Sequence, residues 1–273
     1  SVIAFSDTSS GYANCLCKDI REVNVEDLAK KACDKALKGK NTVTIKPGAY
    51  TVILEPNAVA DMLVFLSYVG FSALSVQEKR SFMCGRFGEK VTGENITLWD
   101  DALSTETIGV PFDFEGVPKE KVVLIENGIA RNVVYDSYTA NLEGKESSGH
   151  ALLYPNLYGP QAANLFLQKG NSNFKEMVKS TKEGILVTRF HYTNIEDPMK
   201  TTLTGVTRDG TFLIENGEIT KGIKNLRFTQ SILEALANVE MISKETALKE
   251  GFFGVVKVPA LKIGRFNFTG LTE

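Results

Sequence analysis

A run of apolar, β-forming residues closed by Asn-Gly occurs twice along the chain and gives the first structural prediction. The residues Leu-Ile-Glu-Asn-Gly stand at 124–128 and again at 213–217. Each copy is followed by a second run with strand character, at 129–136 and at 218–228. Asn-Gly between two such runs is the strongest local hairpin signal, and a type I′ turn needs φ > 0 at both central residues. The pattern predicts two hairpins in one sheet; the alternative is chance recurrence of a common turn.

Two segments show the spacing of helices. Residues 25–37 carry apolar or small residues three and four positions apart, with Asn24 placed to cap the start and Gly39 to end the helix. Residues 58–70 follow Pro56 and are apolar on nearly every side. A helix that is apolar all round is buried. We therefore expect an amphipathic helix over 25–37 and a buried helix over 58–70.

The other periodic segments are short, and together they indicate the fold class. Strands are expected at 1–18 (as an extended arm or strand), 50–54, 96–98, 163–167, 185–192, 252–258 and 261–268, helices at 173–183 and 229–238, and an irregular stretch at 139–160. We predict an α+β fold with a largely antiparallel β-sheet or barrel-like core and packed helices, built around the two Leu-Ile-Glu-Asn-Gly hairpins. No linker or low-complexity segment divides the sequence, so residues 1–273 are expected to form a single domain.

Composition narrows the functional classes. Of 273 residues, 43% are hydrophobic and 23% charged, as in soluble globular proteins. The formal net charge of -2 argues against direct binding of nucleic acid, which usually requires a basic excess. No apolar run is long enough for a transmembrane helix, and the N-terminus lacks signal-peptide features, so we expect a cytoplasmic protein without a membrane partner. Ser1 is not a start methionine, which is consistent with a processed chain or one cut from a longer protein.

Few side chains outside the apolar pattern suggest chemistry. His150 lies in the irregular stretch and is expected to be a solvated loop residue. Asp100 and Asp101 follow a tryptophan at a strand end, where caps or turn formers are expected rather than paired catalytic carboxylates. Ser147 and Ser148 have no histidine placed by the sequence to activate them, which argues against a serine hydrolase.

Seven short blocks together carry a family resemblance. They are Pro47-Gly48 with 50–54, 85–91, 115–127, 164–167 with Gly170, 183–188, 210–217 and 259–262. In this order they resemble the TldD/PmbA family, a peptidase-related group also described as modulators of DNA gyrase. The blocks span the chain from about Gly11 onward and correspond to the family's C-terminal half. The resemblance therefore implies a C-terminal TldD/PmbA domain, with the N-terminal domain of the family absent from this chain.

Where the family is catalytic, the resemblance implies zinc peptidase chemistry. TldD-type members carry His-Glu-x-x-x-His on a helix and a cysteine near the C-terminal end, which together leave a metal position for water. In this sequence the motif falls on Val64, Phe65 and Val69, whose side chains cannot donate to zinc. No cysteine follows Cys84 either. The resemblance thus implies no catalytic residue, no metal ligand and no cofactor here, unless a zinc site of the family type has been missed.

The missing motif places the chain with the PmbA (TldE-like) branch, whose members can act as the non-catalytic partner of a TldD-type subunit. A pseudoenzyme of this kind would handle unfolded or modified peptides during proteolysis. The expected partners are a peptide substrate and a second subunit, in a homodimer or in a heterodimer with a TldD-type chain. Two alternatives stay open: an active metallopeptidase with an unrecognised metal site, and a regulatory binding protein of the modulator-of-DNA-gyrase type.

The candidate peptide groove lies at Arg189, His191, Tyr192 and Asn194, where many relatives have a glycine-rich segment that lines the cleft. Polar side chains there could read a peptide backbone, and the irregular stretch 139–160 could lie over the same region. A stray metal ligand at His191 is a weaker option, since no Cys or carboxylate stands at ligand spacing. The remaining alternative is an alternating strand that merely leaves His191 at the surface.

Overall fold

A helix enclosed by a curved sheet is the central feature of the architecture. The computed structural model describes residues 1–271, in which a two-stranded sheet (β1 and β2) accompanies an eleven-stranded sheet. The strands of the large sheet are β3 (Gly48–Leu54), β4 (Leu98–Asp100), β5 (Val122–Glu126), β6 (Ile129–Ala130), β7 (Asn164–Leu167), β8 (Glu183–Asp197), β9 (Thr202–Glu215), β10 (Glu218–Gly222), β11 (Leu226–Ser231), β12 (Val239–Glu250) and β13 (Val255–Leu271). Only β3–β8 and β7–β13 pair in parallel, so the predicted α+β class with a largely antiparallel sheet is confirmed.

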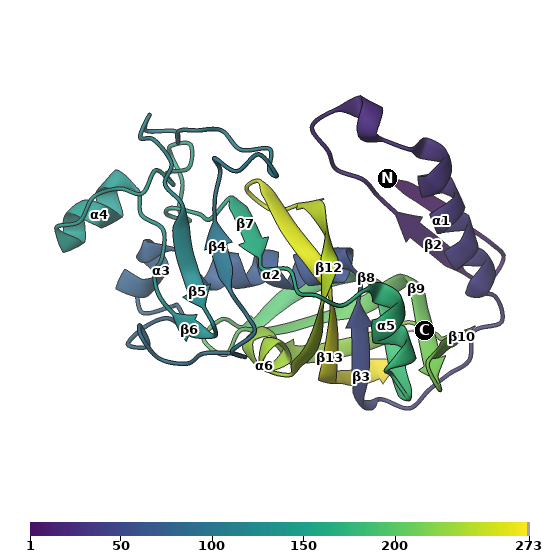
Figure 1. The fold of residues 1–273 in the computed structure, drawn as a ribbon. Coiled ribbons are helices and arrows are strands. Elements are labelled where there is room, and N and C mark those ends of the chain that lie inside the picture. Colours follow the sequence, from purple (N-terminus) through teal and green to yellow (C-terminus); the bar gives the residue numbers. More distant parts are fainter. Residues whose placement is uncertain (272–273) are drawn as a thin grey trace.

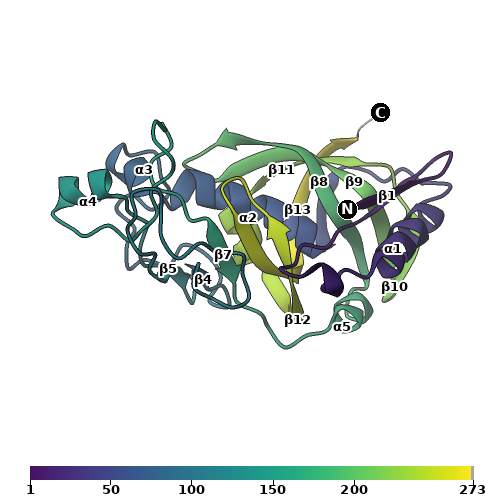
Figure 2. The same ribbon diagram turned by 90° about the horizontal axis from the view of Figure 1, so that it is seen from above.

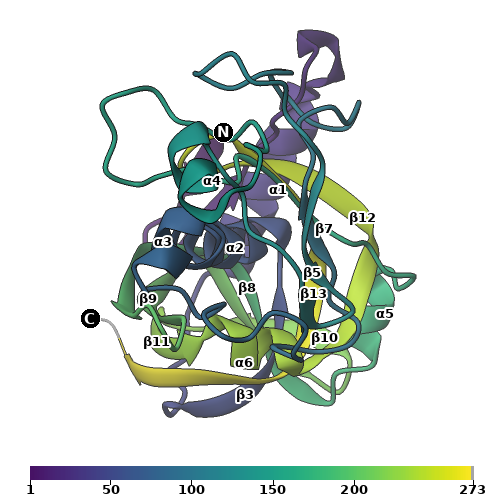
Figure 3. The ribbon, with the colours of Figure 1, turned by 90° about the vertical axis from the view of Figure 1, so that its left-hand side faces the viewer.

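Part of the large sheet closes on itself. Strand β11 pairs with β13 on one side and with β9 on the other. Because β9, β8, β3 and β13 are already paired in that order, these five strands form a closed ring (Figures 2 and 3). Phe190, Phe228 and Phe266 lie within 6 Å of one another, centroid to centroid, and fill the ring with aromatic side chains. The barrel-like core expected from the sequence is therefore present.

Helix α2 (Pro56–Gly70) packs against this ring, chiefly on β8 and β13. Ten of its fifteen residues are buried, as the apolar pattern predicted. Strand alternation places Val52 and Leu54 of β3 in the core with α2, whereas Ile53 faces the other side of the sheet. That other side is covered by the short helix α5 (Phe174–Lys179), which forms a small second core.

Both Leu-Ile-Glu-Asn-Gly segments form hairpins of the same sheet, as predicted. The turn residues Asn127 and Gly128 have φ of 50° and 78°, and Asn216 and Gly217 have φ of 51° and 81°. These are the positive values that a type I′ turn requires. The first turn joins β5 to β6 and the second joins β9 to β10, so the two hairpins lie at opposite ends of the strand order.

The first 46 residues add a small unit beside the ring. Strands β1 (Val2–Phe5) and β2 (Ser10–Ala13) form a hairpin that packs on α1 (Val25–Lys38), with a short turn of 3-10 helix, η1 (Ile20–Glu22), between them (Figure 1). Asn24 caps α1 as predicted, since its side chain accepts a hydrogen bond from Asp27 N–H at 2.9 Å. Gly11 permits the close contact, because a Cβ there would lie 2.1 Å from the carbonyl oxygen of Ala32.

Strands β4 to β7 extend the sheet away from the ring, together with α3 (Ala73–Gln77) and α4 (Ser137–Glu143), and form the left-hand part of Figure 1. The expectation of an irregular stretch over 139–160 was wrong at its start. Asp136 and Thr139 form a capping box that begins α4, and Gly144 ends the helix in the left-handed conformation.

The end of the chain also differs from the prediction. Helix α6 (Ile232–Ala237) is shorter than expected, and the unexpected strand β12 follows it. Strand β13 runs through Pro259, which the sequence suggested would separate two strands. Its pairing with β12 is interrupted by a register shift near Pro259, and the next N–H, that of Ala260, donates to Ser243 Oγ at 2.8 Å. A bulge tolerates proline in a strand because the missing N–H has no ladder partner to lose.

The cysteines and the helices bear on the class of protein. The four cysteines are free, and none of them is buried. Within residues 1–271, no helix combines the length and apolar character that a bilayer-spanning segment needs.

Replacing a turn glycine should test how the first hairpin is docked. Gly128 and Gly116 share a φ of 78°, but a Cβ at Gly128 would lie 2.6 Å from the carbonyl oxygens of Thr92 and Gly93, whereas at Gly116 nothing lies within 4 Å. Left-handed strain alone costs about 1–2 kcal/mol. We expect Gly116→Ala to lose that much in urea unfolding and Gly128→Ala to lose at least about 1 kcal/mol more from overpacking. Equal losses would show that the docking contributes nothing.

Candidate functional site

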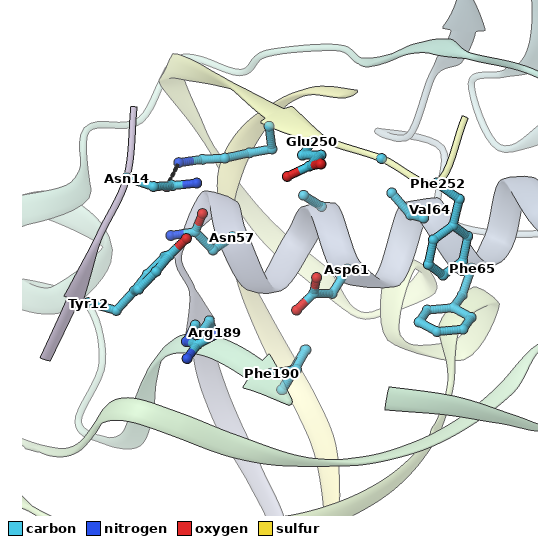
Figure 4. Close-up of a pocket in the computed structure, with 13 residues that line it drawn as sticks. Tyr12, Asn14, Asn57, Asp61, Val64, Phe65, Arg189, Phe190, Glu250 and Phe252 are labelled. Atoms are coloured by element: carbon cyan, nitrogen blue, oxygen red, sulfur yellow. Dashed lines mark hydrogen bonds between the residues drawn. The ribbon is translucent and has the colours of Figure 1, made fainter. Parts of the chain in front are cut away.

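The open side of α2 borders a polar cavity (Figure 4). Residues Asn57, Asp61 and Phe65 stand four positions apart, and so share the one face of the helix that the sheet does not bury. The cavity has a volume of about 470 Å³. We call it the α2 pocket, lined by Tyr12, Asn14, Asn57, Ala60, Asp61, Val64, Phe65, Arg189, Phe190, Lys249, Glu250, Gly251 and Phe252.

The pocket walls come from distant parts of the chain. Tyr12 belongs to β2, Arg189 to β8, and Lys249 and Glu250 to the end of β12. The N-terminal unit is held there by polar contacts: Lys249 Nζ donates to Asn14 Oδ1 at 2.5 Å, and the Arg189 guanidinium lies 4.5 Å from the centre of the Tyr12 ring. Residues 1–46 therefore complete the pocket.

Arg189 is committed to a buried carboxylate. Its Nε donates to Asp209 Oδ2 at 2.7 Å, and its terminal nitrogen also bonds that oxygen. The other carboxylate oxygen accepts a hydrogen bond from Ser10 Oγ at 2.5 Å. The charge of Arg189 is thus balanced before any ligand enters.

Asp61 is the most perturbed acid of the pocket. Burial raises its pKa to about 7, although a hydrogen bond from the backbone N–H of Phe190 and the charge of Arg189 act in the opposite direction. A carboxyl group with this pKa is partly protonated at neutral pH. The signal in the sequence was available, since Asp61 is the one charged residue within 58–70, but it was missed.

Lys249 is the corresponding base. Burial lowers its pKa to about 8, and the nearby carboxylate of Glu55 offsets part of that effect. Glu55 itself is paired with Lys35 at 2.6 Å. Burial also raises the pKa of the Tyr12 hydroxyl, with the charge of Arg189 opposing the rise. Clusters of shifted groups in a cavity are typical of functional sites.

The side chains at the motif positions do not fit zinc. Val64 and Phe65 line the α2 pocket, and Val69 is buried and lies outside it. Gly251 lies opposite Val64, since a Cβ on Gly251 would be 3.4 Å from Cγ2 of Val64. Zinc in proteins is held by N, O or S donors, which this arrangement does not supply. Moreover, no group of three or more His, Cys, Asp or Glu side chains within residues 1–271 is arranged to hold a metal ion.

The four groove candidates are only partly brought together. Arg189 lines the pocket, whereas His191, Tyr192 and Asn194 lie outside it, further along β8. His191 stays close enough to Arg189 and Arg208 that these charges, after burial, lower its pKa. Tyr192 and Asn194 are exposed beside a break in the β8–β9 pairing. Their assignment to a groove remains a prediction.

The expectation that His150 is solvated was wrong. His150 is 1% exposed, with Nε2 3.0 Å from Asp100 Oδ1 and Nδ1 3.0 Å from Ser148 Oγ. The sequence offered no clue to this, because Asp100 is 50 residues away. Asp101 does behave as the expected turn former, accepting a hydrogen bond from Leu103 N–H.

The three side chains have the composition of a serine hydrolase triad but not its access. Ser148 is 8% exposed, and its Oγ accepts a hydrogen bond from Tyr135 N–H at 2.8 Å. A second cavity of about 270 Å³ is bordered by His150, but Ser148 is absent from its lining. Asp100 also accepts a hydrogen bond from Asn164 N–H at 2.6 Å. We therefore assign the Asp100–His150–Ser148 chain a structural role in joining the loops.

Comparison with known proteins identifies the family of the chain. Residues 47–270 match the family model described as the PmbA/TldA metallopeptidase C-terminal domain. A metalloprotease of Methanocaldococcus jannaschii is 30% identical over 237 residues, which is 85% of this chain and 51% of the relative. A metalloprotease TldD homolog of Haemophilus influenzae is 28% identical over 265 residues, 92% of this chain and 54% of the relative. The chain spans about half the length of these curated relatives.

Solved structures share the fold. The crystal structure of TldE from Thermococcus kodakarensis aligns with a TM-score of 0.82 at 25% identity, covering 91% of this chain and 56% of that one. A Thermotoga maritima protein described as a modulator of a DNA gyrase aligns with a TM-score of 0.86 at 23% identity, covering 98% and 60%. The second likeness shows the fold alone.

Neutralising Asp61 should change how stability depends on pH. Its pKa is about 7 in the folded chain and about 3.9 when unfolded, so the folded state binds more protons between these values. Stability from this group is full below about pH 4 and is lost as the pH rises through about 7. We expect Asp61→Asn to be more stable than wild type at pH 8, by at most about 4 kcal/mol, and equal to it at pH 4 in urea unfolding.

The pKa shift of Lys249 predicts the opposite dependence of stability on pH. Its pKa is about 8 when folded and about 10.4 when unfolded, so the unfolded state binds more protons and stability rises across that window. Lys249→Met should therefore gain stability at pH 7, with the gain fading toward pH 10. A pH-independent offset for both variants would contradict the assigned pKa shifts.

Proposed function

The chain belongs to the PmbA/TldA metallopeptidase C-terminal domain family, and from that premise we propose that it is a non-catalytic, peptide-handling subunit in the proteolysis of unfolded or modified peptides. The observation that carries the proposal is the α2 pocket. At the positions where the metal motif would stand, the pocket presents Val64 and Phe65. Its volume and polar rim are nevertheless those of a binding site.

The free polar groups of the pocket suit a peptide backbone. The Tyr12 hydroxyl and the Asn57 amide have no hydrogen-bond partner within the described residues, and Asn14 uses only its oxygen, for Lys249. An amide offers both donors and an acceptor, as a peptide unit requires. Phe65 and Phe252, with ring centroids 4.9 Å apart, add an apolar wall. Such a mixture binds extended chains with little sequence preference.

A partner subunit is supported by exposed apolar side chains near the pocket. The loop between β4 and β5 exposes Val110, Phe112 and Phe114, and the segment before β7 exposes Tyr154 and Leu157, which are 88% and 91% accessible. Several large apolar side chains exposed on neighbouring loops are more typical of a protein interface than of a free surface. Phe252 lines the α2 pocket and Phe253 the second cavity beside these loops, so a docked subunit would lie next to the pocket.

We expect the purified chain to hold no stoichiometric zinc by elemental analysis and to hydrolyse no unfolded peptide, with or without EDTA. Addition of a TldD-type subunit with an intact His-Glu-x-x-x-His should produce activity. The physical reason is the set of donor atoms. Zinc needs about four N, O or S ligands, whereas the side chains at the motif positions of this chain are hydrocarbons.

The matched control uses the same TldD-type subunit with its motif histidines replaced by alanine, which should form the complex and remain inactive. Zinc bound to the isolated chain together with EDTA-sensitive hydrolysis would establish the alternative of an active metallopeptidase with an unrecognised metal site. Failure of any TldD-type subunit to bind, combined with specific binding to gyrase, would favour the regulatory alternative.

A second test concerns the strand that leaves the pocket. If a bound peptide continues past Arg189 along His191, Tyr192 and Asn194, then His191→Ala should weaken peptide binding or assembly several-fold while the thermal unfolding midpoint stays unchanged. Glu196→Ala, an exposed change further along β8, is the control. Wild-type behaviour of His191→Ala in both assays would restrict the site to the α2 pocket.

A further inference from the structure

Two carboxyl groups of the α2 pocket lack a paired cation, whereas its two basic side chains are directed to other partners. Arg189 is paired with Asp209, and Lys249 donates to Asn14 near the carboxylate of Glu55. The carboxylates of Asp61 and Glu250, by contrast, have no Lys, Arg or His nitrogen within 4.0 Å among residues 1–271. Two acids that face one cavity without counter-ions leave it suited to a positively charged group.

Asp61 is the more informative of the two acids. It lies on the open face of α2, and within residues 1–271 its carboxyl group accepts a hydrogen bond only from the backbone N–H of Phe190, so part of its hydrogen-bonding capacity remains unused. Placing an ionisable carboxyl in this largely buried position costs stability, since charge is poorly solvated there. An apolar residue at the same position would pack on the neighbouring Val64 and Phe65 without that cost. A largely buried acid without a counter-ion, facing a cavity, is therefore a candidate ligand contact.

The acceptor groups in the cavity determine which class of cation it can bind. A divalent metal ion would need more carboxylate, carbonyl or water ligands than two separated acids supply, and no cluster of three ligand side chains occurs in the described residues. A primary ammonium needs three acceptors, which Asp61, Glu250 and the Tyr12 hydroxyl or Asn57 carbonyl oxygen can provide. The aromatic ring of Phe65, which also lines the cavity, is further suited to a cation.

We propose that the α2 pocket binds a peptide through a primary ammonium group, with Asp61 as the principal counter-ion and Glu250 as the second. This inference rests on the proposed peptide-handling function and adds to it a polarity: the amine end of a bound segment enters the pocket between α2 and the end of β12. The volume of about 470 Å³ admits the terminal residues of a peptide but not a folded domain. Two sources share this chemistry, the N-terminal α-amine and a lysine side chain.

Calorimetric titration of the full chain with short peptides would test the assignment. The probes are tetra-alanine amide with a free N-terminus, the same peptide N-acetylated, and an N-acetylated version that contains one lysine. At pH 7 we expect the free amine to bind at least tenfold more tightly than the acetylated peptide. The lysine probe identifies the source, since it binds like the free amine only if a side-chain ammonium is also accepted.

Variants of the two acids complete the test. Asp61→Asn should remove most of the preference for the free amine, and Glu250→Gln should reduce it by a smaller factor. Glu245→Gln, an exposed change on the same strand outside the pocket, is the matched control and should leave the preference intact. Thermal unfolding of each variant confirms that the fold is retained.

The outcomes separate this inference from the function on which it rests. If the acetylated peptide binds as tightly as the free amine and Asp61→Asn changes nothing, the ammonium site is wrong although peptide binding stands. If none of the peptides binds, both the ammonium site and the proposed peptide-handling function fail. A preference for the free amine that survives in Asp61→Asn would place the counter-ion elsewhere and overturn the assignment of Asp61.

Discussion

The packing of one largely apolar helix against a closed ring of strands is the constraint on which the rest of this structure depends. Met62, Leu63 and Leu66 of α2 are almost completely inaccessible, and each such side chain contributes about 1.5–3 kcal/mol through removal from water. Because the surrounding elements bury ten of its fifteen residues, the helix keeps a partly accessible line that includes Asn57, Asp61 and Phe65. The same packing that stabilises the fold therefore also decides where a ligand can reach it.

The open line of the helix carries the groups that packing alone does not explain. Asp61 and Lys249 lie at different walls of one cavity, and burial shifts the pKa of the acid upward and of the amine downward. Both shifts mean that the charged forms are poorly solvated in the folded chain. Such groups reduce stability near neutral pH, which is the compromise expected where a surface is shaped for binding rather than for packing.

Composition alone is a poor guide to chemistry in this chain. Asp100, His150 and Ser148 have the identities and contacts of a catalytic triad, yet the hydroxyl is turned toward the backbone of Tyr135 and away from the neighbouring cavity. Conversely, α2 presents Val64 and Phe65, where the sequence analysis expected the family's zinc motif, to a well-formed pocket. In both cases access and donor type, rather than the presence of a motif, decide what the site can do.

Local signals in the sequence determined the hairpins, the capped helix α1 and the burial of α2, because Asn-Gly turns, an N-cap asparagine and an all-apolar helix act over a few residues. The blocks that identify the family could also be recognised in the sequence. Three features could not be predicted from the sequence. They are the pairing of β12 with β13 around Pro259, the burial of His150 against Asp100, and the gathering of Tyr12, Asp61 and Lys249 around one cavity. Those features join residues tens to hundreds of positions apart, and such contacts form only when the strands of the ring and α2 have packed together.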